Sequence, residues 1–175
     1  MIATAEDLRA KIREIPDFPK PGILFYDITT LLKDAAAYKL AIDLMLAPYR
    51  DETIDLVVGM ESRGFIFSAP MAYQLGAGLV PVRKLGKLPA ETITVEYALE
   101  YGSNTLEIHR DAIQPGQRVL IVDDLLATGG TVLGTIELVK QLKAEVVGLA
   151  FLVELLFLKG RERLREYAIH SVIQY

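Results

Sequence analysis

RVLIVDDLLATGGT, which spans Arg118 to Thr131, is the stretch that decides the fold. Its first residues, Arg118 to Val122, form a short run of Val, Leu and Ile, which is typical of a strand buried on both faces of a parallel sheet. Two carboxylates, Asp123 and Asp124, come next, and a loop of small residues then leads into an amphipathic segment. A strand that passes through a short loop into a helix is characteristic of βαβ units. The stretch therefore predicts an α/β fold.

Segments with strand and helix patterns alternate on both sides of this stretch. Short apolar runs separated by amphipathic segments favour a parallel sheet with helices on its faces. We predict strands at Ile54 to Gly59, Leu79 to Val82 and Glu145 to Val153, and helices at Ala3 to Ile15, Asp34 to Tyr49, Gly64 to Leu75 and Thr131 to Leu142. The predicted architecture is a central, mainly parallel, twisted sheet flanked by helices, folded as a single domain of residues 1–175.

Two segments interrupt the alternation. Residues 16–22 hold three prolines and a glycine, which predicts a constrained loop. Residues 83–104 are polar and aromatic, and an insertion of this length in an α/β domain is usually a functional lid or a β-hairpin. We expect one or the other here.

The composition excludes several classes of protein. Apolar residues make up 51% of the 175, which is enough to bury a core and excludes a disordered tail. The net charge of -4 provides no basic field that would draw the chain to nucleic acid or to an anionic membrane. The sequence has no cysteine, which excludes a disulfide scaffold and a thiolate metal site. The charged N-terminus, and apolar runs shorter than the roughly 20 residues of a membrane span, predict a cytoplasmic protein.

The acid pair and the loop after it predict a ribose phosphate site. Ligands of open α/β sheets bind at the carboxyl ends of strands, where Asp123 and Asp124 are expected. In the loop ATGGT, residues 127–131, backbone N–H groups and the hydroxyls of Thr128 and Thr131 can close around a phosphate. Carboxylates would repel a bare phosphate, but they suit the hydroxyls of a sugar or a Mg²⁺ ion. An Asp-Asp pair after a strand is often only a polar turn, and a Gly-Gly pair only a tight connection, whereas the whole run is far more specific.

Two further turns carry cations at the ends of predicted strands. Arg63 lies in the turn GMESRGF, residues 59–65, where small residues leave room for an anion. Arg83, Lys84 and Lys87 are concentrated in one short segment of a chain that is acidic overall, which favours a multiply charged anion such as pyrophosphate. The alternative for this second cluster is a solvated basic turn.

Several motifs together resemble the type I phosphoribosyltransferases, whose substrate is phosphoribosyl pyrophosphate (PRPP). VLIVDDLLATGGT, residues 119–131, resembles the PRPP-binding motif of that family. Motifs that resemble its adenine-specific branch are FPKPGILFYDIT (18–29), ESRGF (61–65), PVRKLGKLP (81–89), LEYG (99–102) and LVELLFLKGRERL (152–164). They follow the family's order along nearly the whole chain. The resemblance implies the family's fold, with a small N-terminal hood (residues 1–33) and a β-hairpin lid (residues 83–104).

The resemblance also implies a reaction. N9 of adenine would attack C1 of PRPP, with Mg²⁺ on the pyrophosphate, to give AMP and pyrophosphate in purine salvage. A homodimer is implied as well. One alternative is a phosphoribosyltransferase for a 6-oxopurine such as hypoxanthine or guanine, because its PRPP half would look the same. A second alternative is a non-catalytic regulatory protein that senses PRPP.

Three residues receive catalytic roles through the resemblance. Glu100, in the lid, would contact N7 of the purine as an acid or base. Arg63 and Lys84 would hold the departing pyrophosphate, because negative charge builds there as the bond from C1 breaks. Arg83 would hold pyrophosphate too, by reaching into the partner subunit of the dimer.

The remaining substrate contacts follow from the same motifs. Asp123 and Asp124 would bind the ribose hydroxyls, residues 127–131 the 5-phosphate, and residues 24–26 and 155 the base, partly through backbone groups. A non-proline cis peptide is expected between Glu61 and Ser62. The full set of expected substrate-binding residues is Asp123, Asp124, Ala127, Thr128, Gly129, Gly130, Thr131, Arg83, Lys87, Glu61, Ser62, Tyr101, Leu24, Phe25, Tyr26 and Leu155.

Overall fold

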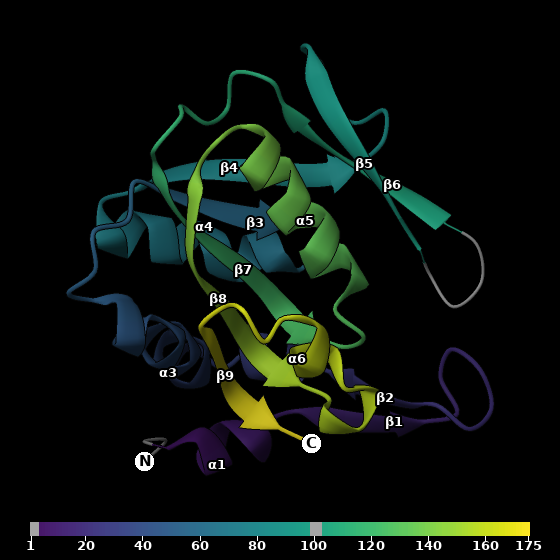
Figure 1. Ribbon diagram of the computed structural model, residues 1–175. Helices are drawn as coiled ribbons and strands as arrows, with labels where there is room; N and C mark the ends of the chain where they lie inside the picture. Colours follow the sequence, from purple (N-terminus) through teal and green to yellow (C-terminus); the bar gives the residue numbers. More distant parts are fainter. Residues whose placement is uncertain (1–3, 99–102) are drawn as a thin grey trace.

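The computed structural model describes residues 4–98 and 103–175, and its core is a seven-stranded sheet with the strand order β5-β6-β4-β3-β7-β8-β9 (Figure 1). The strands are β3 (Leu56–Met60), β4 (Gly78–Lys84), β5 (Thr92–Ala98), β6 (Ser103–His109), β7 (Arg118–Leu126), β8 (Glu145–Glu154) and β9 (Ile169–Gln174). Neighbours from β4 through β9 pair in parallel, whereas β6 runs antiparallel to both β4 and β5. The predicted α/β fold with a mainly parallel sheet is confirmed.

Helices cover both faces of this sheet. The helical elements are α1 (Ala5–Arg9), α2 (Thr29–Leu32), α3 (Ala35–Leu46), α4 (Gly64–Leu75), α5 (Gly130–Gln141), α6 (Gly160–Arg163) and two 3-10 turns, Ala47–Tyr49 and Leu156–Leu158. Along β7, Leu120 and Val122 pack into the core shared with α3 and α4, while Val119 and Ile121 pack into the core shared with α5. Figure 1 shows α5 in front of β7 and α4 behind it. Because side chains of a strand alternate between faces, burial on both faces explains the unbroken apolar run.

The connections leave β3 and β7 in opposite directions across the sheet. From β3 the chain crosses through α4 to β4, and from β7 it crosses through α5 to β8. In open α/β sheets, ligands bind beyond the carboxyl ends of the strands at such a switch point. Parallel pairing between β3 and β7 ends at Gly59 and Val122. The two strands therefore separate at the point where the acid pair begins.

Helix boundaries follow local signals in the sequence. The predicted helix Gly64 to Leu75 is confirmed with both of its bounds, and it ends because Gly76 adopts a left-handed conformation with φ of 65°. The Asp34 carboxylate caps α3 by accepting the backbone N–H groups of Ala36 and Ala37, at 3.1 and 3.2 Å. Among the residues that the model describes, no helix has both the length and the apolar character to cross a membrane.

The prediction of one helix from Ala3 to Ile15 is wrong. Ala3 lies outside the described residues, and α1 ends at Arg9. Arg13–Pro16 forms strand β1, which pairs antiparallel with β2 (Leu24–Asp27) around the predicted proline-rich loop. The Arg13 guanidinium donates to the Asp27 carboxylate at 2.5 Å, so a contact across the hairpin outweighs the local helical pattern.

Most other predicted strands and helices are present with bounds shifted by one or two residues, and two elements differ by more. Strand β7 continues past Val122 to Leu126, because β8 still pairs with it after β3 has ended. The acid pair thus lies within a strand rather than after it. The insertion that begins at Arg83 does contain a β-hairpin, β5 and β6, which extends beyond Asn104 to His109. Its action as a lid stays a prediction.

Candidate active site

A cleft of about 530 Å³ opens at the carboxyl ends of β3, β4 and β7. Its lining residues are Glu61, Ser62, Arg63, Lys84, Lys87, Asp123, Asp124, Leu125, Ala127 and Thr131. All of them except Leu125 were expected from the sequence to bind substrate. The fold thus brings together, from three strand ends, the acid pair, the small-residue loop and both cationic turns.

The acid pair is held in place from two sides. The Asp124 carboxylate is buried and accepts the Arg63 Nε–H at 2.5 Å, while Arg63 itself is about half exposed to the cleft. The Asp123 Oδ1 accepts the backbone N–H of Asp124 at 2.9 Å. A Cβ at Gly64 would lie 2.7 Å from that same Oδ1, so α4 can begin against the carboxylate only because residue 64 is glycine. Arg63 therefore orients the Asp124 carboxylate, and Gly64 leaves the space that the Asp123 carboxylate occupies.

The electrostatics of Asp123 favour a positively charged or hydrogen-donating ligand. Burial, and next the neighbouring Asp124 carboxylate, raise the pKa of Asp123 well above its ordinary value. Both causes disfavour the ionised form in the ligand-free protein. A cation or sugar hydroxyls bound beside the pair would stabilise that form.

The small-residue loop leads directly from β7 into α5. Gly129, which precedes the helix, has φ of 81°, a conformation that favours glycine. The first backbone N–H groups of a helix have no partner inside it, so the start of α5 offers donors to an anion. Ala127 and Thr131 line the cleft, whereas Thr128, Gly129 and Gly130 shape the turn between them.

Helix α6 supports this loop from behind. A Cβ at Gly160 would overlap the carbonyl oxygen of Ala127, and a Cβ at Gly129 would lie 3.2 Å from the carbonyl oxygen of Gly160. The Arg163 guanidinium donates to the carbonyl oxygen of Thr128 at 3.1 Å. Neither Gly160 nor Arg163 was predicted to have a role of its own. The signal available for them was the GRER run, where a glycine opens a short cationic helix.

On the opposite side of the cleft, the Glu61 carboxylate binds the cationic segment of residues 83–87. This carboxylate accepts the Lys87 ammonium at 2.7 Å, the backbone N–H of Lys84 at 2.9 Å and the Arg83 guanidinium at 3.3 Å. Burial would raise the pKa of Glu61, but these three donors outweigh it and lower the pKa to about 2. The expected cis peptide between Glu61 and Ser62 is present. Arg83 contacts Glu61 of its own chain, and its reach into a partner subunit stays a prediction.

The residues expected around the base lie beside the cleft rather than in its lining. The Phe25 ring centroid is 5.7 Å from the guanidinium carbon of Arg63, so Phe25 borders the cleft. Leu24 is 41% exposed, and Leu155 is buried with its backbone N–H donating to the carbonyl oxygen of Leu126 at 3.0 Å. Tyr26 stacks on Tyr175, with 3.9 Å between the ring centroids.

Glu100 and Tyr101, the two residues predicted on the lid, lie outside the described residues. The described parts of the hairpin end at Ala98 and resume at Ser103. The roles of Glu100 and Tyr101 remain predictions.

Comparisons with known proteins agree with this arrangement. The family model of the phosphoribosyl transferase domain matches residues 27–174. The adenine phosphoribosyltransferase of Chloroflexus aurantiacus is 59% identical over 172 residues, which cover 98% of this chain and 99% of the relative.

Solved structures show the same likeness. The crystal structure of adenine phosphoribosyltransferase from Thermoanaerobacter pseudethanolicus is 55% identical, with a TM-score of 0.94 over 98% of this chain and 100% of that one. The enzyme from Saccharomyces cerevisiae, crystallised with an imino-altritol bisphosphate and adenine, is 41% identical with a TM-score of 0.91, over 96% and 97% of the two chains. Neither the 6-oxopurine alternative nor the regulatory alternative is supported by these relatives. The chain belongs to the phosphoribosyl transferase family and, within it, to the adenine phosphoribosyltransferases.

Proposed function

We propose that this chain transfers the 5-phosphoribosyl group of PRPP to N9 of adenine and releases AMP and pyrophosphate, as a step of purine salvage. The observation that carries the proposal is the cleft at the switch point of the sheet, which is lined by the acid pair, the small-residue loop of residues 127–131 and the cationic turns. A phosphate, a ribose and a pyrophosphate follow one another along PRPP. The adenine bound in the yeast relative supports the choice of base.

The acid pair and the loop would bind the sugar phosphate end. Asp123 and Asp124 would accept hydrogen bonds from the ribose hydroxyls, which are neutral donors that two carboxylates can share. The backbone N–H groups of residues 127–131 would bind the 5-phosphate at the start of α5, together with the Thr131 hydroxyl. Asp124 would exchange part of its contact with Arg63 for the ribose, since the guanidinium already extends into the cleft.

The cations would stabilise the leaving group. As the bond from C1 to the pyrophosphate oxygen breaks and the bond from C1 to N9 forms, negative charge collects on the pyrophosphate. Arg63, Lys84 and Lys87 line the cleft and would stabilise that negative charge. Lys87 would release Glu61 in exchange for a phosphate oxygen, which is a swap of one anionic partner for another.

The donor set fits Mg²⁺ in the way that this ion binds together with substrate phosphates. Mg²⁺ takes one or two carboxylates and completes its shell with phosphate oxygens and water. Asp123 and Asp124 supply two neighbouring carboxylates, and the described residues hold no group of three or more His, Cys, Asp or Glu that could bind a metal by themselves. A Mg²⁺ ion bound beside these carboxylates would neutralise charge on the departing pyrophosphate.

AMP formation is the direct test of the function. The purified chain with PRPP, Mg²⁺ and adenine is expected to produce AMP and pyrophosphate in equal amounts. Hypoxanthine is expected to react with a kcat/KM lower by about 10⁴, since a site built to pair an amino group leaves buried groups unpaired against a keto oxygen. PRPP binding without any AMP would contradict the proposal and would favour the regulatory alternative. A preference for hypoxanthine would favour the 6-oxopurine enzyme.

Replacing Glu100 by Gln is expected to lower kcat by about 10² or more, because general acid or base catalysis contributes roughly that much. The KM for PRPP should change little, since Glu100 is proposed to meet the purine and not the ribose phosphate. Glu91→Gln is the matched control, because Glu91 lies in the same insertion but pairs on the surface with Arg110 at 2.9 Å. Unchanged turnover in Glu100→Gln would contradict the acid or base role.

A homodimer is part of the proposal, because the role suggested for Arg83 requires a partner subunit. Sedimentation of the full chain tests it, and a monomer at assay concentration would contradict it. The cytoplasmic location stays a prediction.

A further inference from the structure

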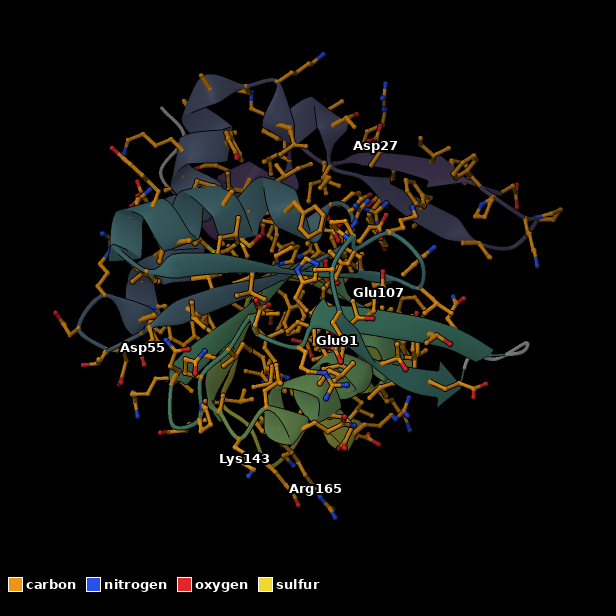
Figure 2. The ribbon with its side chains drawn as sticks, turned by 90° about the horizontal axis from the view of Figure 1, so that it is seen from above. Asp27, Asp55, Glu91, Glu107, Lys143 and Arg165 are labelled. Atoms are coloured by element: carbon orange, nitrogen blue, oxygen red, sulfur yellow. The ribbon has the colours of Figure 1, made fainter. Side chains whose placement is uncertain are left out.

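Glu107 is a buried carboxylate outside the cleft that the proposed reaction does not use. It lies on β6, and only 2% of the residue is exposed. Figure 2 labels it on the hairpin of β5 and β6, near Glu91. A buried charge is costly unless it is hydrogen-bonded, so its partners indicate what it does.

Those partners belong to the turn that follows β4. One oxygen of Glu107, Oε1, accepts the backbone N–H groups of Lys87 at 2.7 Å and of Leu88 at 2.8 Å. The other oxygen, Oε2, faces the Thr92 hydroxyl at 3.5 Å. Burial alone would raise the pKa of Glu107, but the backbone donors outweigh it and lower the pKa. The carboxylate is therefore ionised and binds the turn by charge-assisted hydrogen bonds.

The same turn carries Lys87 into the cleft, next to Lys84 at the end of β4. Lys87 is bound at both ends, with its backbone N–H on Glu107 and its ammonium on Glu61, each at 2.7 Å. Gly86, next to it, has φ of 84°, so the turn is sharp at this point. Glu107 pairs with Arg83, and Leu106 with Lys84, across β4 and β6. The antiparallel pairing therefore fixes the position of Glu107 along the sheet relative to Lys84.

We infer that Glu107 is a positioning residue, which fixes the turn of residues 85–88 so that Lys84 and Lys87 face the pyrophosphate end of the substrate. The inference rests on the proposed function and adds a residue to it. Without the carboxylate, the backbone N–H groups of Lys87 and Leu88 lose their acceptor, while the backbone N–H of Leu85 still donates to the carbonyl oxygen of Thr105 on β6 at 3.1 Å. The far part of the turn, which carries Lys87, therefore loses its hydrogen bonds to β6. The lysine side chains would remain charged, but they would no longer be held in position. Stabilisation of a charged leaving group depends on donors that are already in place, so it would weaken.

Binding of the two products separates this role from a general structural one. Glu107→Ala is expected to weaken pyrophosphate binding by about tenfold, the cost of losing one charged hydrogen bond. AMP binding should stay within a factor of about two, because the small-residue loop proposed to bind its phosphate lies between β7 and α5 rather than on the turn that Glu107 holds. Titration calorimetry of the full chain with inorganic pyrophosphate and with AMP gives the two dissociation constants. The KM for PRPP should rise together with the dissociation constant for pyrophosphate.

Two conservative variants keep the test decisive if Glu107→Ala folds poorly. Glu107→Gln retains an oxygen that can accept both N–H groups and is expected to keep pyrophosphate binding within about threefold of the wild type. Glu107→Asp keeps the charge but withdraws the oxygens by one methylene, and it is expected to weaken pyrophosphate binding selectively. Rescue by Gln together with loss in Asp would identify the position of the acceptor as the property that matters.

Asp55→Ala is the matched control. The Asp55 carboxylate also accepts a backbone N–H, that of Arg118 at 2.7 Å, but it lies at the other end of the sheet (Figure 2). Pyrophosphate binding should be unchanged in this variant. Equal weakening of AMP and pyrophosphate in Glu107→Ala, or no weakening of pyrophosphate, would overturn the inference. A wild-type chain that makes no AMP would overturn the proposed function instead.

Discussion

Replacing Asp124 by Asn is expected to lower kcat/KM for PRPP by about two orders of magnitude. Asp124 is buried, and its carboxylate is the partner of Arg63. Asn keeps the size of the side chain but removes the charge, so the ribose loses an anionic acceptor and Arg63 loses the group that orients it. Loss of one partner of a buried, hydrogen-bonded charge pair costs about 2–5 kcal/mol, and the lower part of that range applies because Arg63 is half exposed.

Steady-state kinetics with varied PRPP at saturating adenine measure this effect. Asp43→Asn is the matched control, since Asp43 also accepts from two cations, Lys39 and Arg50, but on the surface of α3. We expect that control to have wild-type kinetics, because exposed ion pairs contribute little. A kcat/KM within about threefold of the wild type in Asp124→Asn would show that the acid pair does not bind the ribose.

Replacing Gly160 by Ala is expected to weaken AMP binding and to raise the KM for PRPP by about fivefold or more. The added methyl group would overlap the carbonyl oxygen of Ala127, which is backbone and cannot rotate away. The loop must therefore shift, and overpacking of this kind costs about 1–3 kcal/mol. The N–H groups of residues 127–131 move with the carbonyl, away from the place where the 5-phosphate would bind.

Gly134→Ala is the matched control for this substitution. Gly134 lies inside α5, where Ala is the better helix former, and its added Cβ would meet the end of the Leu106 side chain at 3.3 Å. Titration calorimetry with AMP and pyrophosphate is the measurement. Gly160→Ala should weaken AMP alone, which is the reverse of the pattern expected for Glu107→Ala. Wild-type AMP affinity in Gly160→Ala would rule out support of the loop by α6.

The spacing of apolar residues in the sequence predicted the helices and strands whose side chains are buried in the core. The helix Gly64 to Leu75 and the strand runs near Val58 and Ile121 follow from apolar spacing and from glycines at helix ends. Residues near Ile15 do not follow from such patterns, because they pair with β2 through contacts across the hairpin. Strand β9 was not predicted at all, since its half-buried edge position leaves little apolar signal in the sequence.

The candidate site shows the same division. Residues that line the cleft occupy the turns directly after strands, so motif and position identified Arg63, Lys84 and Asp124 together. Gly160 and Glu107 act on those turns from elements that lie far away in the sequence. Apart from the GRER run at Gly160, the sequence around these two residues gives no sign of a ligand, because their contribution is to hold other backbone segments in place. Supporting residues of this kind become visible only when the chain is folded.

The pairing of charges within the cleft affects how a substrate first meets the protein. Three acidic and three basic side chains line the opening, and Arg63 and Lys87 are each bound to one of the acids. Because two of the three cations are already paired, such a surface has little net field at a distance, and the chain as a whole is negative. Diffusing polyanions are therefore steered only weakly, and their association rate should depend little on ionic strength. Discrimination arises after contact, when the incoming phosphates compete with Glu61 and Asp124 for the same donors.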